Sequence, residues 1–370
     1  MSVVSLRWWQ RGWVWLTAWP VLLLGVVSAA CAQGLPAADA PQPSFQRERW
    51  LDTARQRHVM LRIAWPAAAV DAGVSAWPVL LMSSPQGFRW SGHTDHYVEL
   101  SREMVRRGVV MVTVSHVDAD EPMTGQERFA DVYPGVLTGA LNDPSVDRFE
   151  DLRFVLRELE RLAAQPAPGR PRLDLQRVAV AGHSSGTLTA LQMAGMPVRD
   201  RHGKVHTRHH DPRIKAFVVY SWPLEYRGPL RDDLAEVGAV AGLHVAGSQD
   251  MPAYRNTAYR YVNGAPQHWL VVEGGHNVGA RGSDALVLEA TGSFIDVYLK
   301  GLQGSQQRLG VDALGRFGDA LKQYRSKGPQ RVKSPDQRDF VAWARETLPG
   351  GRWLHDQGIR FQRQREEAPR

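Results

Sequence analysis

The stretch that decides the fold runs from residue 178 to residue 191 and reads VAVAGHSSGTLTAL. Its first four residues are small and apolar, as in a buried strand, and the residues after the second glycine favour a helix. Gly182 and Gly186 suit a tight connection, because a Cβ at either position would clash where strand and helix pack closely. The G-x-S-x-G pattern in this context predicts that the central Ser184 is exposed at the end of a sheet as a nucleophile. The simpler interpretation is a Ser/Gly turn without chemistry.

Short apolar runs and amphipathic segments alternate on both sides of this stretch. Runs rich in Val and Leu predict strands that are buried on both faces, and the segments between them predict helices. The predicted strands are Val59–Ile63, Val79–Met82, Val109–Val114, Val178–Ala181, Ala216–Tyr220, Leu243–Ala246 and Trp269–Val272, and the predicted helices are Asp95–Arg107, Asp147–Ala164, Ser185–Gly195 and Asp284–Leu302. This alternation predicts an α/β fold, in which a mostly parallel central sheet is flanked by helices on both faces.

A serine hydroxyl is a weak nucleophile, so it requires a base and an acidic residue that orients the base. On a sheet of this type the expected chain order is Ser, then Asp or Glu, then His, each just beyond a strand. Asp250 lies four residues after Leu243–Ala246, and His276 follows Trp269–Val272 and a Gly-Gly turn. Ser184, Asp250 and His276 are therefore the predicted catalytic triad.

Other acidic and histidine residues are less well placed for these roles. His183 lies inside the turn, where its ring cannot fold back onto the nucleophile, so we expect it to pack beside the triad. Asp211 precedes its strand, and His268 begins its strand at the opposite edge of the sheet. Glu273 is predicted to face a helix. None of the four competes with Asp250 or His276.

Two backbone N–H groups are expected to stabilise the oxyanion of the reaction. Ser185 is predicted to supply the first from the start of its helix. The second is expected from the loop after an early strand, where Ser84-Pro85-Gln86-Gly87 predicts a tight turn. Gly87 is the first choice and Gln86 the second. The alternative is an ordinary turn, with the donor elsewhere.

The candidate substrate-binding side chains are those of His183 and Trp222. Aromatic residues near the predicted strand ends form either an apolar acyl pocket or part of the core; these residues are Trp90, Tyr97, Trp222 and Tyr226. Three histidines spaced by four would align as metal ligands on a helix, namely His202, His206 and His210. Gly203 and Pro212 predict a loop there instead, so neither a metal nor a cofactor is expected.

Taken together, the motifs resemble those of a known superfamily. The chain looks like the dienelactone-hydrolase-like and platelet-activating-factor-acetylhydrolase-like esterases of the α/β-hydrolase superfamily. The matching stretches span roughly residues 45 to 300 and are WLDTARQRHVMLRIAWP, DLRFVLREL, VAVAGHSSG, DPRIKAFVVYS, VAGSQD and VVEGGHNV. The resemblance implies an α/β-hydrolase fold and a serine esterase, with Ser184 as nucleophile, Asp250 orienting and His276 as general base.

The sequence departs from these relatives at two positions. True dienelactone hydrolases carry a cysteine nucleophile where this chain has Ser184, which argues against their substrate. Many relatives have His-Gly in the oxyanion loop, where this chain has Pro85-Gln86. Its Ser84-Pro85 pair is more similar to the Ser-Pro-Gly turn of cutinase-like polyester hydrolases.

The first 44 residues predict export. Arg7 and Arg11 are the only charged residues before Cys31, and they precede the apolar run Gly12–Val27 and three small residues. This pattern is typical of a cleaved signal peptide over residues 1–30, with a retained membrane anchor as the alternative. Cys31, the single cysteine, follows the break as in a bacterial lipobox, so either lipidation at Cys31 or soluble export is expected. Residues 31–44 are rich in Pro and Ala and predict a flexible linker.

Composition separates the rest of the chain into two parts. The 370 residues, 43% of them hydrophobic, allow one large catalytic domain, predicted over residues 45–302. Residues 303–370 are rich in Arg and Gln and predict a basic C-terminal extension with short helices around Val311–Tyr324 and Pro335–Thr347. The extension either packs on the domain or binds a partner. The net charge is +7, but the basic residues are interspersed with acidic ones except at the C-terminus. No zinc-finger or RNA-binding signature occurs, so nucleic acid is not an expected partner.

The sequence thus predicts an exported serine hydrolase that cleaves carboxylic esters, with a small-molecule ester as its substrate. Two alternatives stay open at this point. One is a cell-envelope acyltransferase that uses the same triad, and the other is a catalytically silent binding protein on a hydrolase scaffold.

Overall fold

The computed structural model describes residues 42–67, 76–85, 96–116, 144–165, 170–200, 203–222, 230–279 and 284–329. Several predictions fall outside these ranges: the signal peptide, Cys31, the predicted helix Pro335–Thr347, and the site candidates Gln86, Gly87, Trp90 and Tyr226. Among the described helices, none combines the length and the apolar character that crossing a bilayer requires.

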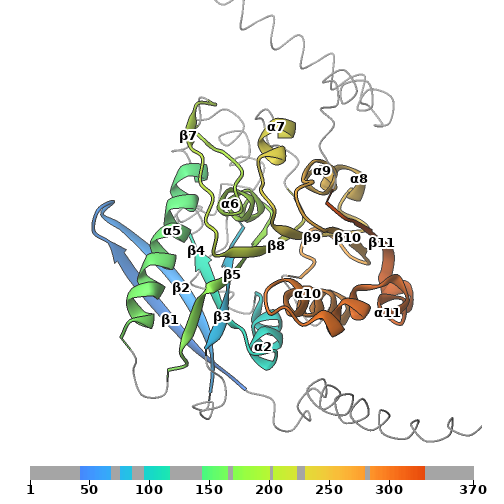
Figure 1. Cartoon of the computed structure of the whole chain (residues 1–370), viewed down its shortest axis with the longest axis horizontal. Helices are drawn as coiled ribbons and strands as arrows, with labels where there is room; N and C mark the ends of the chain where they lie inside the picture. The colour runs from blue at the N-terminus through green and yellow to red at the C-terminus, as the bar shows by residue number, and fades with distance from the viewer. Residues whose placement is uncertain are drawn as a thin grey trace, which may run out of the picture. The chain divides into compact units, whose positions relative to one another are not determined.

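Nine of the described strands form one sheet, in the order β1-β2-β4-β3-β5-β8-β9-β10-β11 (Figure 1). Their bounds are β1 Pro43–Asp52, β2 Arg57–Pro66, β3 Trp77–Ser83, β4 Val110–Ser115, β5 Leu173–His183, β8 Ile214–Tyr220, β9 Ala241–Gly247, β10 Gln267–Val272 and β11 Leu321–Lys327. The six strands from β4 to β10 run parallel, and β1, β2 and β11 complete the edges in antiparallel pairing. All seven predicted strands are confirmed.

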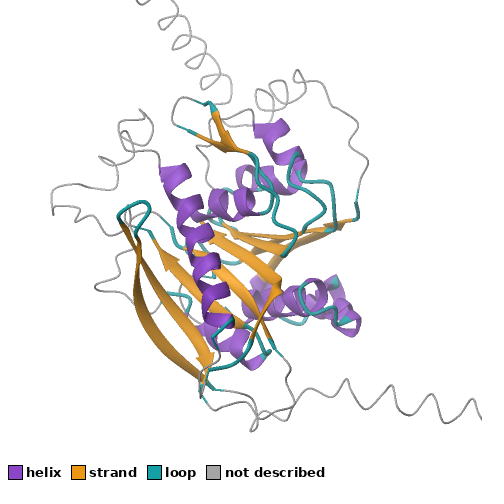
Figure 2. Ribbon diagram, turned by 60° about the vertical axis from the view of Figure 1, so that its left-hand side comes forward, coloured by secondary structure: helices purple, strands orange, loops and turns teal. Residues whose placement is uncertain are grey.

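Helices cover both faces of this sheet (Figure 2). The long helices are α2 Val98–Arg106, α5 Pro144–Ala163, α6 Gly186–Met193 and α10 Ala285–Tyr298. α5 and α6 pack together on one face, and α2 and α10 pack together on the other. Because β3, β4, β9 and β10 are buried along their whole length, their Val- and Leu-rich runs have apolar neighbours on both sides. The predicted helices and the predicted α/β architecture are confirmed.

The C-terminal end of the described sheet differs from the prediction. The helix expected over Val311–Tyr324 is short: α11 spans Val311–Gly315, between the 3-10 helices η1 Gln303–Leu309 and η2 Gly318–Ala320. α11 ends at Gly315, and Gly318, with a φ of 56° in the left-handed region, begins η2, so the α-helix does not continue. The next residues form β11, which pairs with β10 and covers its edge. The sheet therefore continues beyond residue 302, where the sequence analysis ended the domain.

Two features are not predicted by the sequence pattern, namely the strand β1 and the small hairpin of β6 (Val198–Arg199) and β7 (Val205–Thr207). β1 reads PSFQRERWLD, and most of its side chains are exposed at the sheet edge. An edge strand of this kind carries neither an apolar run nor a clean alternation, so periodicity gives no signal for it. The hairpin agrees with the prediction that the histidine-rich segment is not helical.

Candidate active site

Ser184 lies at the turn between β5 and α6, at the carboxyl edge of the parallel strands. Its φ of 53° is in the left-handed region, which non-glycine residues rarely adopt. A Cβ at Gly182 would overlap the carbonyl oxygen of Gly186, and a Cβ at Gly186 would overlap that of Ser83. The Ser184 N–H donates to Tyr220 O at 3.0 Å and fixes the turn against β8. The predicted strand–turn–helix connection is present, with both glycines required by their neighbours.

Asp250 and His276 form a hydrogen-bonded pair at the same edge of the sheet. Asp250 follows β9 and is 7% exposed, whereas the His276 side chain follows β10 and is 38% exposed. His276 Nδ1 lies 3.0 Å from Asp250 Oδ2. Because a carboxylate only accepts, Nδ1 carries the proton and Nε2 is the nitrogen left for a proton from a nucleophile.

Arg255, in the short helix α8 (Pro252–Arg255), is a second partner of Asp250 that sequence analysis did not find. Its Nη2 lies 2.7 Å from Asp250 Oδ1, its Nε donates to Asp250 O at 3.1 Å, and its Nη1 donates to the carbonyl of Trp222. Burial raises the pKa of the Asp250 carboxyl, but the hydrogen bond from His276 and the charge of Arg255 outweigh it and lower that pKa. Asp250 is therefore ionised at neutral pH.

His183 connects the turn to the loop that carries His276. Its Nε2 lies 2.7 Å from the His276 carbonyl oxygen, and its Nδ1 lies 3.0 Å from the Tyr97 hydroxyl. Because a carbonyl only accepts, Nε2 donates and Nδ1 accepts from Tyr97. Burial lowers the pKa of His183 to about 4, so the ring carries a single proton at neutral pH, as these two bonds require.

The prediction that His183 binds substrate is corrected by this geometry. The residue is 1% exposed, and both ring nitrogens bond to other parts of the protein. Its ring centroid lies 5.1 Å from that of His276, so it packs beside the predicted base, as the sequence analysis also expected. The role that the contacts support is holding the His276 backbone in place.

Trp222 and Tyr97 are also buried. Trp222 follows β8 and is 3% exposed, and its carbonyl lies against Arg255. Tyr97 is 1% exposed, and its φ of 61° places it at the left-handed N-terminal cap of α2. Burial keeps the pKa of the Tyr97 phenol well above its usual value, so the hydroxyl retains the proton that it donates to His183. Tyr97 belongs to the core, and Trp222 as a wall of the substrate pocket remains a prediction.

The described residues also narrow the choice of oxyanion donors. Ser185 directly precedes α6, as expected for the first donor. In the turn after β3, the Ser84 N–H donates to Val114 O at 3.1 Å, and Pro85 has no N–H. Neither residue can supply the second donor, so Gln86 and Gly87 keep that prediction. No cluster of three or more His, Cys, Asp or Glu side chains suited to a metal occurs in the described ranges.

Comparison with known proteins gives a fold but no close relative. No family model matches the sequence, and no curated protein matches it. A puromycin hydrolase mutant complexed with PGG matches with a TM-score of 0.50 and 18% identity, over 74% of this chain and 42% of that one. Another puromycin hydrolase structure matches with a TM-score of 0.47 and 17% sequence identity, over 71% of this chain and 40% of that one. A structure of fungal esterases from Rhizomucor miehei matches with a TM-score of 0.47 and 13% sequence identity, and the match covers 78% of this chain and 93% of the esterase chain.

The chain thus spans less than half of the length of the puromycin hydrolase chains. The strand order of the sheet and the likeness to the puromycin hydrolase mutant show that the chain has the α/β-hydrolase fold. The finer resemblance to the dienelactone-hydrolase-like and platelet-activating-factor-acetylhydrolase-like esterases remains a prediction from sequence.

Proposed function

We propose that the chain is a serine hydrolase that cleaves carboxylic esters through an acyl-enzyme on Ser184. The observation that carries this proposal is the strained turn at Ser184, at the same edge of the sheet as the hydrogen-bonded pair of Asp250 and His276. A left-handed serine between two glycines that tolerate no Cβ is costly for the fold. Such strain is expected where it aims a nucleophile out of the sheet.

The proposed reaction uses the three side chains in two half-reactions. His276 Nε2 takes the proton of Ser184 Oγ as this oxygen attacks the ester carbonyl carbon. The charge of Asp250 stabilises the imidazolium that forms, and the N–H of Ser185 with that of Gly87 or Gln86 binds the oxyanion. The intermediate collapses when His276 gives its proton to the leaving alcohol. Water then attacks the acyl-enzyme by the same route and frees Ser184.

The contacts around the triad support this assignment of roles. Arg255 holds Asp250 Oδ1 and leaves Oδ2 facing His276, so the carboxylate cannot turn away from the imidazole. His183, the residue next to Ser184, donates a hydrogen bond to the backbone carbonyl of His276. The base is thus fixed at its ring and at its main chain, which is the preorganisation that a general base requires.

Replacing the nucleophile tests the proposal directly. We expect Ser184→Ala to lower the turnover of p-nitrophenyl acetate by about 10⁴-fold or more, because the remaining groups only bind and polarise the ester. Ser44→Ala, an exposed serine on β1, is the matched control and should keep the wild-type rate. Circular dichroism checks that both variants fold.

A fluorophosphonate probe gives an independent readout of the same proposal. It should label Ser184 in the wild-type protein and leave Ser184→Ala unlabelled. Wild-type turnover in Ser184→Ala, or labelling of another serine at full rate, would contradict the proposal. Products formed with an added alcohol distinguish hydrolysis from acyl transfer, since a transferase passes the acyl group to the alcohol in preference to water.

A further inference from the structure

A second Ser-His-Asp triad lies inside the molecule, apart from the candidate active site. Ser83 Oγ lies 2.9 Å from His116 Nε2, and His116 Nδ1 lies 2.9 Å from Asp151 Oδ2. The three residues, here called the buried triad, come from the end of β3, the residue after β4 and the helix α5. All three are 0% exposed. An ester cannot reach Ser83 in this position, so the buried triad is not a second hydrolytic site.

The acidic end of the buried triad is tied to the hairpin of β1 and β2. Arg55 Nη2 and Arg57 Nε each lie 2.8 Å from Asp151 Oδ1, and Arg57 Nη2 lies 3.1 Å from Asp151 Oδ2. Burial raises the pKa of Asp151, but the hydrogen bond with His116 and the charge of Arg57 lower it to about 2. Asp151 is therefore a fixed negative charge that joins the hairpin, α5 and the residue after β4.

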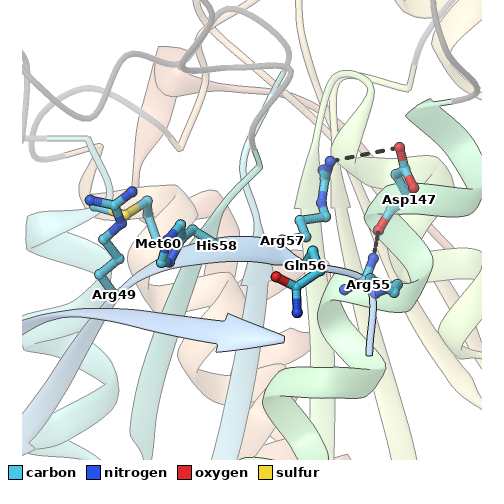
Figure 3. Close-up of a pocket in the computed structure, with 7 residues that line it drawn as sticks. All are labelled: Arg49, Arg55, Gln56, Arg57, His58, Met60 and Asp147. Atoms are coloured by element: carbon cyan, nitrogen blue, oxygen red, sulfur yellow. Dashed lines mark hydrogen bonds and ion pairs between the residues drawn. The ribbon is translucent and has the colours of Figure 1, made fainter. Parts of the chain in front are cut away.

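The two arginines also line a pocket at the surface of the hairpin (Figure 3). Figure 3 shows Arg55 and Arg57 reaching from the hairpin to Asp147 of α5, with the Arg57 to Asp147 ion pair at 3.6 Å. Arg55 is bound by Asp52 as well, at 2.7 Å. Since carboxylates inside the protein already balance both guanidinium groups, these contacts serve to hold the hairpin on α5.

The serine end of the buried triad adjoins the candidate active site. The carbonyl oxygens of Ser83 and Ser84 lie against Gly186, in the first turn of α6, so closely that no Cβ fits between them. The buried Arg148 of α5 donates to Ser84 O at 2.7 Å, and the Ser84 N–H bonds to Val114. Ser83 is thus held by its side chain and Ser84 by its carbonyl and amide, while the carbonyl oxygens of both residues pack on Gly186.

We propose that the buried triad is a positioning device, which fixes the end of β3 against the first turn of α6 and thereby sets the geometry in which the oxyanion is bound. The inference rests on the proposed function, because the oxyanion belongs to that reaction. Its physical basis is that electrostatic stabilisation of the transition state depends on donors that do not move. A misplacement of about 1 Å lowers the rate on the order of 10²-fold.

The variant Ser83→Ala tests this role, since it removes one hydroxyl and leaves the bond between His116 and Asp151 in place. For p-nitrophenyl acetate we expect kcat to fall about tenfold with KM within about twofold of wild type. The inhibition constant of a trifluoromethyl ketone, which forms a tetrahedral oxyanion on the nucleophile, should rise by the same factor as kcat falls. If the buried triad served stability alone, neither kcat nor the inhibition constant would change in Ser83→Ala.

Ser293→Ala is the matched control for this experiment. Ser293 is also fully buried and its hydroxyl donates one hydrogen bond, to Glu289 Oε1 at 2.9 Å, but it lies in α10 on the opposite face of the sheet. The variant Ser293→Ala should lose about as much thermal stability as Ser83→Ala, but its kcat and inhibition constant should stay at the wild-type values. The variant His116→Gln and the double variant with Ser83→Ala extend the test. If the residues act as one device, the double variant is no slower than the slower single variant.

The possible outcomes separate this inference from the proposed function. If Ser184→Ala is inactive while Ser83→Ala keeps wild-type kcat, the proposed function stands and the positioning role is wrong. The positioning role is also wrong if kcat falls without a change in the inhibition constant. If Ser184→Ala keeps full activity, the proposed function fails, and the inference about the buried triad fails with it.

Discussion

The ion pair between Arg255 and Asp250 allows a quantitative prediction for the variant Arg255→Met. Both side chains are buried, at 8% and 7% exposure, and Arg255 makes three hydrogen bonds in this region. Methionine fills a similar space without charge, so the main effect is that Asp250 loses its cationic partner. His276 then remains as the neighbour that stabilises the Asp250 carboxylate.

The expected loss of stability follows from burial. Removing one partner of a buried ion pair lowers the free energy of unfolding by about 3–5 kcal/mol, because the other charge stays desolvated and unpaired. In a domain of this size that corresponds to a decrease of about 10 °C in melting temperature. The exposed pair of Arg102 and Glu99 supplies the control, since their side chains are 49% and 39% exposed. We expect Arg102→Met to cost about 0.5 kcal/mol.

The effect of pH has a definite sign. The pKa of Asp250 in the folded protein is lower than its usual value of 3.8, so the carboxylate stabilises the fold above about pH 4. This stabilisation is lost as the pH falls through the lowered pKa. In Arg255→Met the hydrogen bond from His276 still lowers the pKa of Asp250, but the part of this stabilisation that comes from the charge and hydrogen bond of Arg255 is gone. The difference in unfolding free energy between wild type and variant is therefore largest at neutral pH and shrinks on acidification.

Urea denaturation of wild type, Arg255→Met and Arg102→Met, at neutral pH and at about pH 3.5, measures these quantities. Because Arg255 also holds Asp250 towards His276, kcat for p-nitrophenyl acetate should fall about tenfold in Arg255→Met. Equal losses in the two arginine variants at neutral pH would refute the reasoning. So would a loss in Arg255→Met that does not change with pH.

Two further predictions concern His183 and Cys31. His183→Phe keeps the ring volume but removes the hydrogen bonds that His183 makes with the His276 carbonyl and the Tyr97 hydroxyl, so we expect a kcat about tenfold lower and a loss of roughly 1–3 kcal/mol in the free energy of unfolding. His183→Gln retains an N–H donor that can reach the His276 carbonyl, so this variant should recover most of kcat. Equal activities of the two variants would argue against a role of the hydrogen bond between His183 and the His276 carbonyl. If residues 1–30 are removed on export and Cys31 is lipidated, mass spectrometry of the protein from a bacterial membrane fraction should show an acylated N-terminal Cys31, and Cys31→Ser should move the protein to the soluble fraction; an unmodified Cys31 would refute the lipid anchor.

The strands and helices could be predicted because their signals are local. The parallel strands β3, β4, β9 and β10 are buried along their whole length and read as mostly apolar runs, and β5 and β8 are buried over their carboxyl-terminal halves. The same rule placed the candidate triad: Ser184, Asp250 and His276 each follow the carboxyl end of a parallel strand, and those ends meet at one edge of the sheet. The bond between Asp250 and His276 agrees with that expectation.

The contacts that hold the site could not be predicted, because they join residues that are distant in sequence. Arg55 and Arg57 meet Asp151 across 96 and 94 positions, and no local pattern marks either end. Arg255 lies five residues from Asp250, but whether it turns towards the carboxylate depends on the Trp222 carbonyl. The prediction that His183 binds substrate is wrong because a five-residue motif does not indicate which of its side chains are buried.

The buried triad and the candidate triad differ in ways that separate a structural arrangement from the one proposed for catalysis. His116 and His276 each bond to an aspartate through Nδ1, at 2.9 and 3.0 Å, so the hydrogen bonds alone do not separate them. The difference lies in the serine and in access. Ser83 is the last residue of a strand that is paired on both sides, and its triad is closed to solvent. Ser184 adopts a left-handed turn, and the candidate base His276 is 38% exposed. A turn between two glycines can be recognised in sequence, so the G-x-S-x-G pattern predicts the nucleophile proposed here. The buried triad joins a strand residue to a distant histidine, and no local pattern in the sequence marks it.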